Sequence, residues 1–215
     1  MERISLFAIA LLLLSGSCST PKKVEAAKPS RATGPVEPPP AYRVIFETTT
    51  GPFTIQVYRP WAPKGADRFY EMVQAKFYDG VRFHRVMRKF VAQFGIHPDP
   101  KVNGMWRMLK IGDDRRVRKN TRGSVAFAMN GPNTRSTQVF VNLADNAVLD
   151  TKGFVPFGEV VDGMENVDRL CKIYGDVAPL GAGPNPAKIE LVGNSYLDRE
   201  YPRLDGIKTA RVSLK

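Results

Sequence analysis

The feature that most constrains the fold is a series of short apolar runs with a two-residue repeat, separated by turns. In "YRVIFETTTGPFTIQVYR", apolar residues alternate at positions 44 and 46, a Gly-Pro turn follows, and the alternation resumes at 53, 55 and 57. Such alternation is typical of β-strands that bury one face. Further runs that we interpret as strands are VRFHRVM, FVAQFG, SVAFAMN, STQVFVNL, FVPFGEVV and AKIELVG.

Two segments have the spacing of amphipathic helices instead. Apolar residues recur at 66, 69, 72 or 73 and 77 in "WAPKGADRFYEMVQAKFYDG", and at 164, 167, 170 and 171 in "GMENVDRLCKIYG". Glycine follows each of them as a stop signal. Many short strands with two dispersed helices favour a mainly all-β fold, a closed antiparallel barrel, over a β-α-β sheet. We assign this domain to residues 42–192 and treat 193–215 as an extension with a short helix and a basic tail.

The N-terminal residues are typical of an export signal. Residues 1–17 have a charged start, an apolar stretch from Leu6 to Leu14 and then small residues, and that stretch is short for a membrane span. Small residues that end at Cys18 resemble the bacterial lipoprotein signal, in which the cysteine is acylated, although Ser15 stands where leucine is usual. Residues 18–41 are rich in Pro, Ala, Ser and Lys, and we expect them to form a tether. The chain is therefore expected in the periplasm or cell envelope, lipid-anchored or, alternatively, exported and soluble.

The chain is strongly basic, with a formal net charge of +11 over its 215 residues. Such a charge favours anionic surroundings but does not determine a fold. Residues 101–122 hold eight Lys or Arg against two Asp; we expect them to form a solvated loop, with an anionic-lipid surface as the alternative. Export argues against nucleic acid as a partner. The two cysteines, Cys18 and Cys171, lie too far apart for a metal-binding or redox pair, and we expect no metal and no cofactor.

Two motifs indicate a family. "FYDGVRFHRVMRKFVAQFG" (77–95) and "GSVAFAMNGPNTRSTQVFVNL" (123–143) resemble the signature segments of cyclophilin-type peptidyl-prolyl cis–trans isomerases. "GFVPFGEVVDGMENVDRL" (153–170) resembles the strand and helix that end that fold, so the resemblance covers about residues 42–192. It implies an eight-stranded antiparallel barrel capped by two helices. It also implies an enzyme that rotates prolyl peptide bonds in proline-containing polypeptides.

The resemblance assigns roles to particular residues. Arg85 occupies the position of the family's catalytic arginine, and Gln93 that of the polar group that orients it. His84 neighbours Arg85 in a predicted strand, so its side chain leaves the opposite face, and we expect it to be structural. Alignment with the apolar proline pocket and with the groove for the preceding peptide backbone gives the remaining contacts: Phe90, Val91, Phe140, Leu149 and Phe154 in the pocket, and Ala128, Met129, Asn130 and Gln138 in the groove.

Three pocket positions depart from the family's usual residues. Val91 stands where methionine is common, Val148 where tryptophan is frequent, and Phe154 where a histidine is often found. None of these changes removes the guanidinium, so we expect activity, and we expect weak binding of the inhibitor cyclosporin. The alternative is a non-catalytic peptide-binding or scaffold lipoprotein that kept the barrel. In either case we expect a monomer.

Overall fold

A computed structural model of the chain describes residues 37–213. The predicted signal peptide, Cys18 and nearly all of the tether lie outside the described residues. The strands are β1 (Ala41–Thr48), β2 (Phe53–Tyr58), β3 (Arg85–Val86), β4 (Val91–Phe94), β5 (Ser124–Phe127), β6 (Val139–Asn142), β7 (Pro156–Asp162) and β8 (Ile207–Ser213). The helices are α1 (Pro63–Gln74), α2 (Pro100–Met108), α3 (Ala147–Thr151), α4 (Met164–Asp168), α5 (Pro186–Val192) and α6 (Asn194–Glu200), with a short 3-10 helix at Arg59–Trp61.

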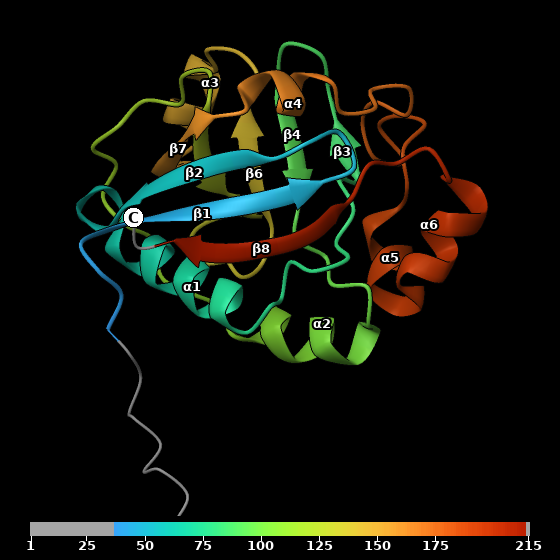
Figure 1. Cartoon of the computed structure of the whole chain (residues 1–215), viewed down its shortest axis with the longest axis horizontal. Coiled ribbons are helices and arrows are strands. Elements are labelled where there is room, and N and C mark those ends of the chain that lie inside the picture. The colour runs from blue at the N-terminus through green and yellow to red at the C-terminus, as the bar shows by residue number, and fades with distance from the viewer. Residues whose placement is uncertain (1–36, 214–215) are drawn as a thin grey trace, which may run out of the picture. The chain divides into compact units, whose positions relative to one another are not determined.

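The eight strands form one antiparallel sheet in the order β3-β4-β6-β5-β7-β2-β1-β8 (Figure 1). The two end strands meet at a seam, where residues 80–83, just before β3, run beside 205–207. The Gly80 N–H donates to the carbonyl of Ile207 and the Ile207 N–H donates to that of Val81, both at 2.8 Å. The seam brings the edges of the sheet together, and the predicted eight-stranded antiparallel fold is confirmed.

The first hairpin supplies the centre of the core, as the alternation predicts. Strands β1 and β2 each bury every second residue. The rings of Phe46 and Phe53 stack with their centroids 4.9 Å apart, and Phe69 of α1 packs on Phe46 at 6.2 Å. Each large apolar side chain buried in this way stabilises the fold by roughly 1.5–3 kcal/mol. Helix α1 therefore covers the barrel through its predicted apolar face.

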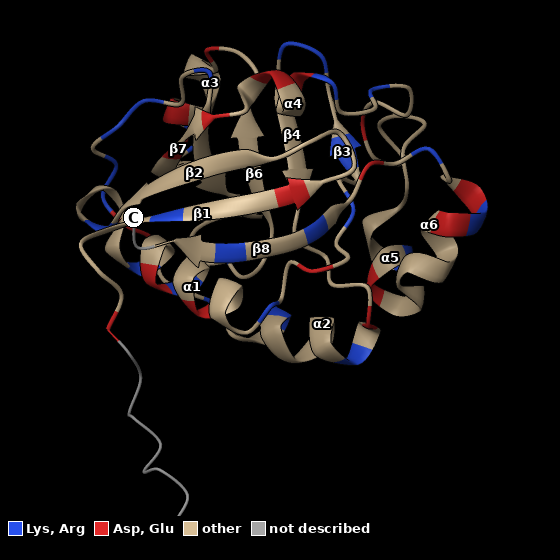
Figure 2. Cartoon of the chain, in the orientation of Figure 1, with Lys and Arg blue, Asp and Glu red and all other residues tan. Residues whose placement is uncertain are grey.

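The basic segment 101–122 is more structured than we expected. Its first part is helix α2, in which Pro100 occupies the first turn and the Asp99 side chain accepts from the Lys101 N–H at 2.8 Å. Val102 and Trp106, four residues apart, pack against the core. The prediction of a solvated loop was therefore wrong for this part. Lys and Arg are distributed over several elements and loops of the described chain, with acidic residues among them (Figure 2).

The C-terminal part departs most from the sequence interpretation. AKIELVG, which we interpreted as a strand, lies in helix α5, because Asn185 accepts from the Ala187 N–H at 2.9 Å and Pro186 fits the first turn. The final strand is instead β8, which pairs with β1 along its length. Residues 193–213 are thus no separate extension: the helix α6 is present, but the strand that follows it completes the sheet. The described residues also hold six α-helices, where three were expected, two in the domain and one in the extension.

Candidate active site

A small cavity opens beside the end strand β3 and its neighbour β4. Its volume is about 150 Å³. Val91, Phe140 and Leu149 are buried in its wall, and the ring of Phe154 meets that of Phe140 edge-on, with centroids 5.6 Å apart. Every lining residue was predicted from the sequence: Arg85, Phe90, Val91, Gln93, Ala128, Met129, Phe140, Leu149 and Phe154. Val148, by contrast, is 52% exposed and does not line the cavity.

Sheet register brings the polar residues of this cavity into one row. Arg85 of β3 lies opposite Gln93 of β4, and Gln93 lies opposite Phe140 of β6. The Arg85 Nη1 donates to the Gln93 Oε1 at 3.2 Å, and the Gln93 Nε2 donates to the Gln138 Oε1 at 2.8 Å. The Arg85 guanidinium also lies over the Phe90 ring, 5.5 Å from its centroid. The strand pairing thus holds a cationic donor at the rim of an apolar hollow.

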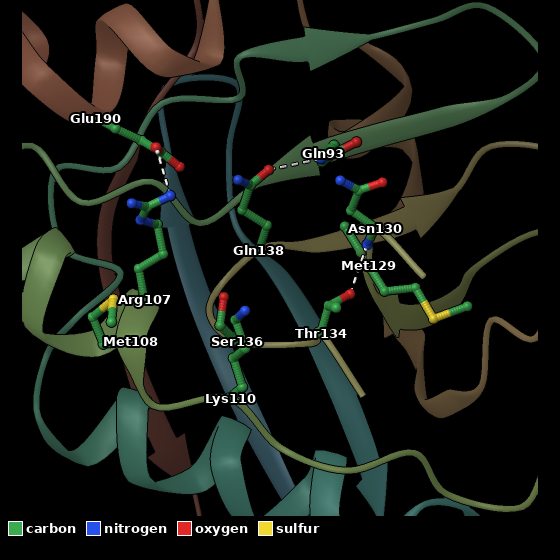
Figure 3. Close-up of a pocket in the computed structure, with 11 residues that line it drawn as sticks. Gln93, Arg107, Met108, Lys110, Met129, Asn130, Thr134, Ser136, Gln138 and Glu190 are labelled. Carbon is green, nitrogen blue, oxygen red and sulfur yellow. Dashed lines mark hydrogen bonds and ion pairs between the residues drawn. The ribbon is translucent and has the colours of Figure 1, made fainter. Parts of the chain in front are cut away.

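The predicted groove residues Asn130 and Gln138 lie in a second, larger cavity that shares Gln93, Ala128 and Met129 with the first. Its volume is about 480 Å³. In Figure 3, Arg107 of α2 and Glu190 of α5 face each other across one side of it, and their side chains form an ion pair at 3.2 Å. Thr134, Ser136, Met108 and Lys110 complete its lining. The sequence analysis missed the residues that α2 and α5 contribute, because it assigned neither helix.

A second missed residue touches the arginine itself. The Arg85 Nε donates to the Asp176 Oδ1 at 2.6 Å, and both side chains are largely buried, with exposed fractions of 23% and 18%. Partial burial alone would raise the pKa of Asp176, but hydrogen bonds from Arg85 and from the Val177 N–H, with the charge of Arg85, bring it below its ordinary value. No spacing in the sequence connects residue 176 with residue 85, so this contact could not be predicted.

His84 takes no part in the cavity. Its side chain is 2% exposed and lines neither cavity. Burial, and next the charge of Arg85, lower the pKa of His84 to about 4, so its ring is neutral at neutral pH. Such a ring is a structural group and not a proton donor to substrate.

Residues 37–213 contain no group of three or more His, Cys, Asp and Glu side chains arranged to hold a metal ion. Within the same residues, no helix combines the length and the apolar character that crossing a membrane requires.

The family model described as cyclophilin type peptidyl-prolyl cis-trans isomerase/CLD matches residues 43–190. This chain belongs to the cyclophilin family. Among its relatives is peptidyl-prolyl cis-trans isomerase CYP18-2 of Arabidopsis thaliana, 33% identical over 139 residues, which cover 62% of this chain and 82% of the relative. Peptidyl-prolyl cis-trans isomerase ppi1 of Schizosaccharomyces pombe is 36% identical over 139 residues, 62% of this chain and 87% of the relative.

A crystal structure confirms the cyclophilin fold. The cyclophilin type isomerase of Cryptosporidium parvum superposes with a TM-score of 0.60 at 20% identity, over 81% of this chain and 99% of that one. With the family match and the similar isomerases, the chain is a peptidyl-prolyl cis–trans isomerase. The roles of the individual cavity residues stay predictions, although the structure brings all the predicted residues to the two adjoining cavities.

Proposed function

We propose that this isomerase rotates prolyl peptide bonds by donating a hydrogen bond from Arg85 to the prolyl nitrogen while the proline ring lies in the small apolar cavity. The observation that supports this most directly is the guanidinium at the rim of a hollow walled by Phe90, Phe140 and Phe154. The apolar hollow suits an uncharged proline ring, and the guanidinium reaches the peptide bond that precedes that ring.

The chemistry requires neither a nucleophile nor a proton acceptor. An amide bond resists rotation by about 18–20 kcal/mol because the nitrogen lone pair is shared with the carbonyl. As the bond twists, the lone pair returns to the nitrogen, which becomes a better hydrogen-bond acceptor. A donor placed there binds the twisted state more tightly than either planar state, and such differential binding lowers the barrier.

Arginine has enough donors for this task. A guanidinium carries five N–H groups; within the described residues, Asp176 engages the Nε and Gln93 engages the Nη1. The Nη2 makes no hydrogen bond to any described residue, which leaves it available to substrate. The second cavity, lined by Asn130 and Gln138, would hold the residues that precede the proline. The Cryptosporidium parvum isomerase has also been crystallised in the presence of the dipeptide Ala-Pro.

A protease-coupled peptide assay on the full-length protein tests the proposal. Arg85→Ala should lower kcat/KM by roughly 10²-fold, the usual loss for one preorganised donor in an active site. Arg85→Lys, which keeps the charge but not the planar fork, should recover only part of it. Arg82→Ala is the matched control, since Arg82 donates to Leu204 and Asp198 instead. Equal rates for wild type and Arg85→Ala would refute the arginine mechanism and favour a peptide-binding scaffold.

We further propose that the clients are exported polypeptides and that Cys18 carries a lipid. Support comes from the sequence of residues 1–17 and the small residues before Cys18. Mass spectrometry of the mature N-terminus should find acylated Cys18, and Cys18→Ala should release the protein from membranes. A mature chain that still begins at Met1 would refute export, and an unmodified Cys18 at the new N-terminus would refute the anchor.

A further inference from the structure

The loop between Gly175 and Gly183 contacts the end strand β3 through Asp176. It belongs to the segment between α4 and β8, which also carries α5 and α6. At its start, the Asp176 carboxylate accepts the hydrogen bond from the Arg85 Nε at 2.6 Å. We propose that Asp176 is a positioning residue for isomerisation: it fixes the orientation of the Arg85 guanidinium so that its remaining donors face the prolyl nitrogen. This inference rests on the proposed role of Arg85.

The loop holds the carboxylate firmly in place. The same Oδ1 atom accepts from the Val177 N–H at 2.8 Å, and the Asp176 carbonyl accepts from the Gly183 N–H at 2.8 Å. A Cβ built at Gly181 or Gly183 would lie 2.5 or 2.6 Å from that carbonyl, so both positions require glycine for this close approach. Tyr201, beyond α6, donates from its hydroxyl to the Gly183 carbonyl at 3.3 Å. The segment between α4 and β8 therefore anchors Asp176 from several directions.

Two anchors on different nitrogens define the plane of the guanidinium. Asp176 binds the Nε and Gln93 binds the Nη1, while the Phe90 ring lies against the group. An arginine side chain loses rotamer freedom when it is ordered, which costs free energy. Because Asp176 and Gln93 impose that order before substrate binds, the arginine does not have to be ordered in the transition state.

The kinetics of a variant distinguish a positioning role for Asp176 from an ion pair that only stabilises the fold. Asp176 does not line the cavity, so its loss should leave ground-state binding of the proline ring almost unchanged. A misdirected donor should instead weaken an interaction made in the twisted state. The effect should thus fall on kcat and leave KM within about twofold. It should also vanish once Arg85 itself is removed, since the two residues then no longer share a function.

The experiment is a double-mutant cycle in the full-length protein with Asp176→Asn, Arg85→Ala and both together. Asparagine keeps the shape and an acceptor oxygen but removes the charge. We expect Asp176→Asn to lower kcat about tenfold in the wild-type background, less than the loss of the donor itself, and to change nothing in the Arg85→Ala background. The control is Asp198→Asn. Asp198 forms an ion pair with Arg82 at 2.8 Å, and this pair, like Asp176–Arg85, joins the segment between α4 and β8 to the residues around β3. The kcat of Asp198→Asn should match that of the wild type.

Two spectroscopic readouts accompany the kinetics. The Arg85 Nε–H resonance in ¹H–¹⁵N spectra should move in Asp176→Asn and stay in place in Asp198→Asn. Circular dichroism should show that all variants are folded. A wild-type kcat in Asp176→Asn, or an equal loss in both backgrounds, would overturn the positioning role while leaving the function of Arg85 intact. Equal rates for wild type and Arg85→Ala would overturn both proposals.

Discussion

Ile207 offers a direct test of whether the C-terminal strand belongs to the barrel. It begins β8, it is 1% exposed, and its side chain joins the main hydrophobic core. Its backbone makes two of the hydrogen bonds of the seam, one with Gly80 and one with Val81. The substitution Ile207→Ala keeps those backbone bonds and removes only buried carbon atoms, so it measures the packing of β8 alone.

The size of the effect follows from the burial. Truncating a fully buried isoleucine to alanine costs about 2–5 kcal/mol, as lost transfer free energy plus the cavity left behind. For a chain of this length, 1 kcal/mol corresponds to roughly 2–4 °C in Tm. A loss of about 3 kcal/mol should therefore lower Tm by roughly 6–12 °C. Leu191→Ala is the control, since Leu191 is 77% exposed on α5 and should change stability by less than about 0.5 kcal/mol.

Urea unfolding followed by far-UV circular dichroism, with thermal melts beside it, provides both numbers. If Ile207→Ala unfolds at the same urea concentration as Leu191→Ala, residues 193–215 are a dispensable extension. The assignment of β8 to the core would then be refuted.

Three further predictions concern pH, specificity and helix capping. The pKa of His84 is about 4 in the folded state and about 6.5 when unfolded, so unfolding takes up a proton between these values. The free energy of unfolding should therefore fall by about 2 kcal/mol from pH 7 to pH 5. Urea titrations of His84→Gln should lack this component, and an unchanged pH dependence in that variant would contradict the prediction. Lys110 lines the second cavity and forms no ion pair with any described residue. It should favour peptides with glutamate over lysine before the proline by about two- to fivefold in kcat/KM. Lys110→Glu should reverse that preference, and an identical ratio in both proteins would exclude a contact between residue 110 and the peptide. Asn185→Ala should destabilise the protein by about 1 kcal/mol in urea unfolding through the lost cap of α5, whereas no change would mean that this cap adds nothing to global stability.

Most of the cavity could be predicted from the sequence because all its lining residues except Leu149 and Phe154 lie in two continuous motifs. Arg85 and Gln93 fall in one motif, and Gln138 and Phe140 fall in the other, so a resemblance within each is enough to place them. Strand pairing then brings the motifs together without further information from distant segments. Phe154 lines the cavity as expected, but the interpretation of Val148 as a pocket position was wrong, because Val148 is exposed and does not line the cavity.

The contribution of the C-terminal segment could not be read in the same way. AKIELVG is a short apolar run, and in such runs periodicity alone does not separate a strand from a helix. The Asn-Pro pair at 185–186 was the available signal, since it forms the cap and first turn of α5. β8 could not be recognised from an apolar pattern because it is partly charged: Lys208 and Arg211 are exposed, and only Ile207 and Ala210 are buried. Its partner strand is distant in sequence, and the same is true of the Asp176 contact.

The pairing of β1 with β8 also affects how the molecule is assembled. Val44 lies opposite Val212, so most of the described chain separates these two neighbours in sequence. During synthesis, β1 and β2 can form a hairpin early, but the outer edge of β1 stays unpaired until β8 has emerged. Unpaired strand edges invite association with other chains, and contacts so remote in sequence form slowly. A protein with this topology, although itself a prolyl isomerase, is thus exposed to misassembly until the residues of β8 have been synthesised.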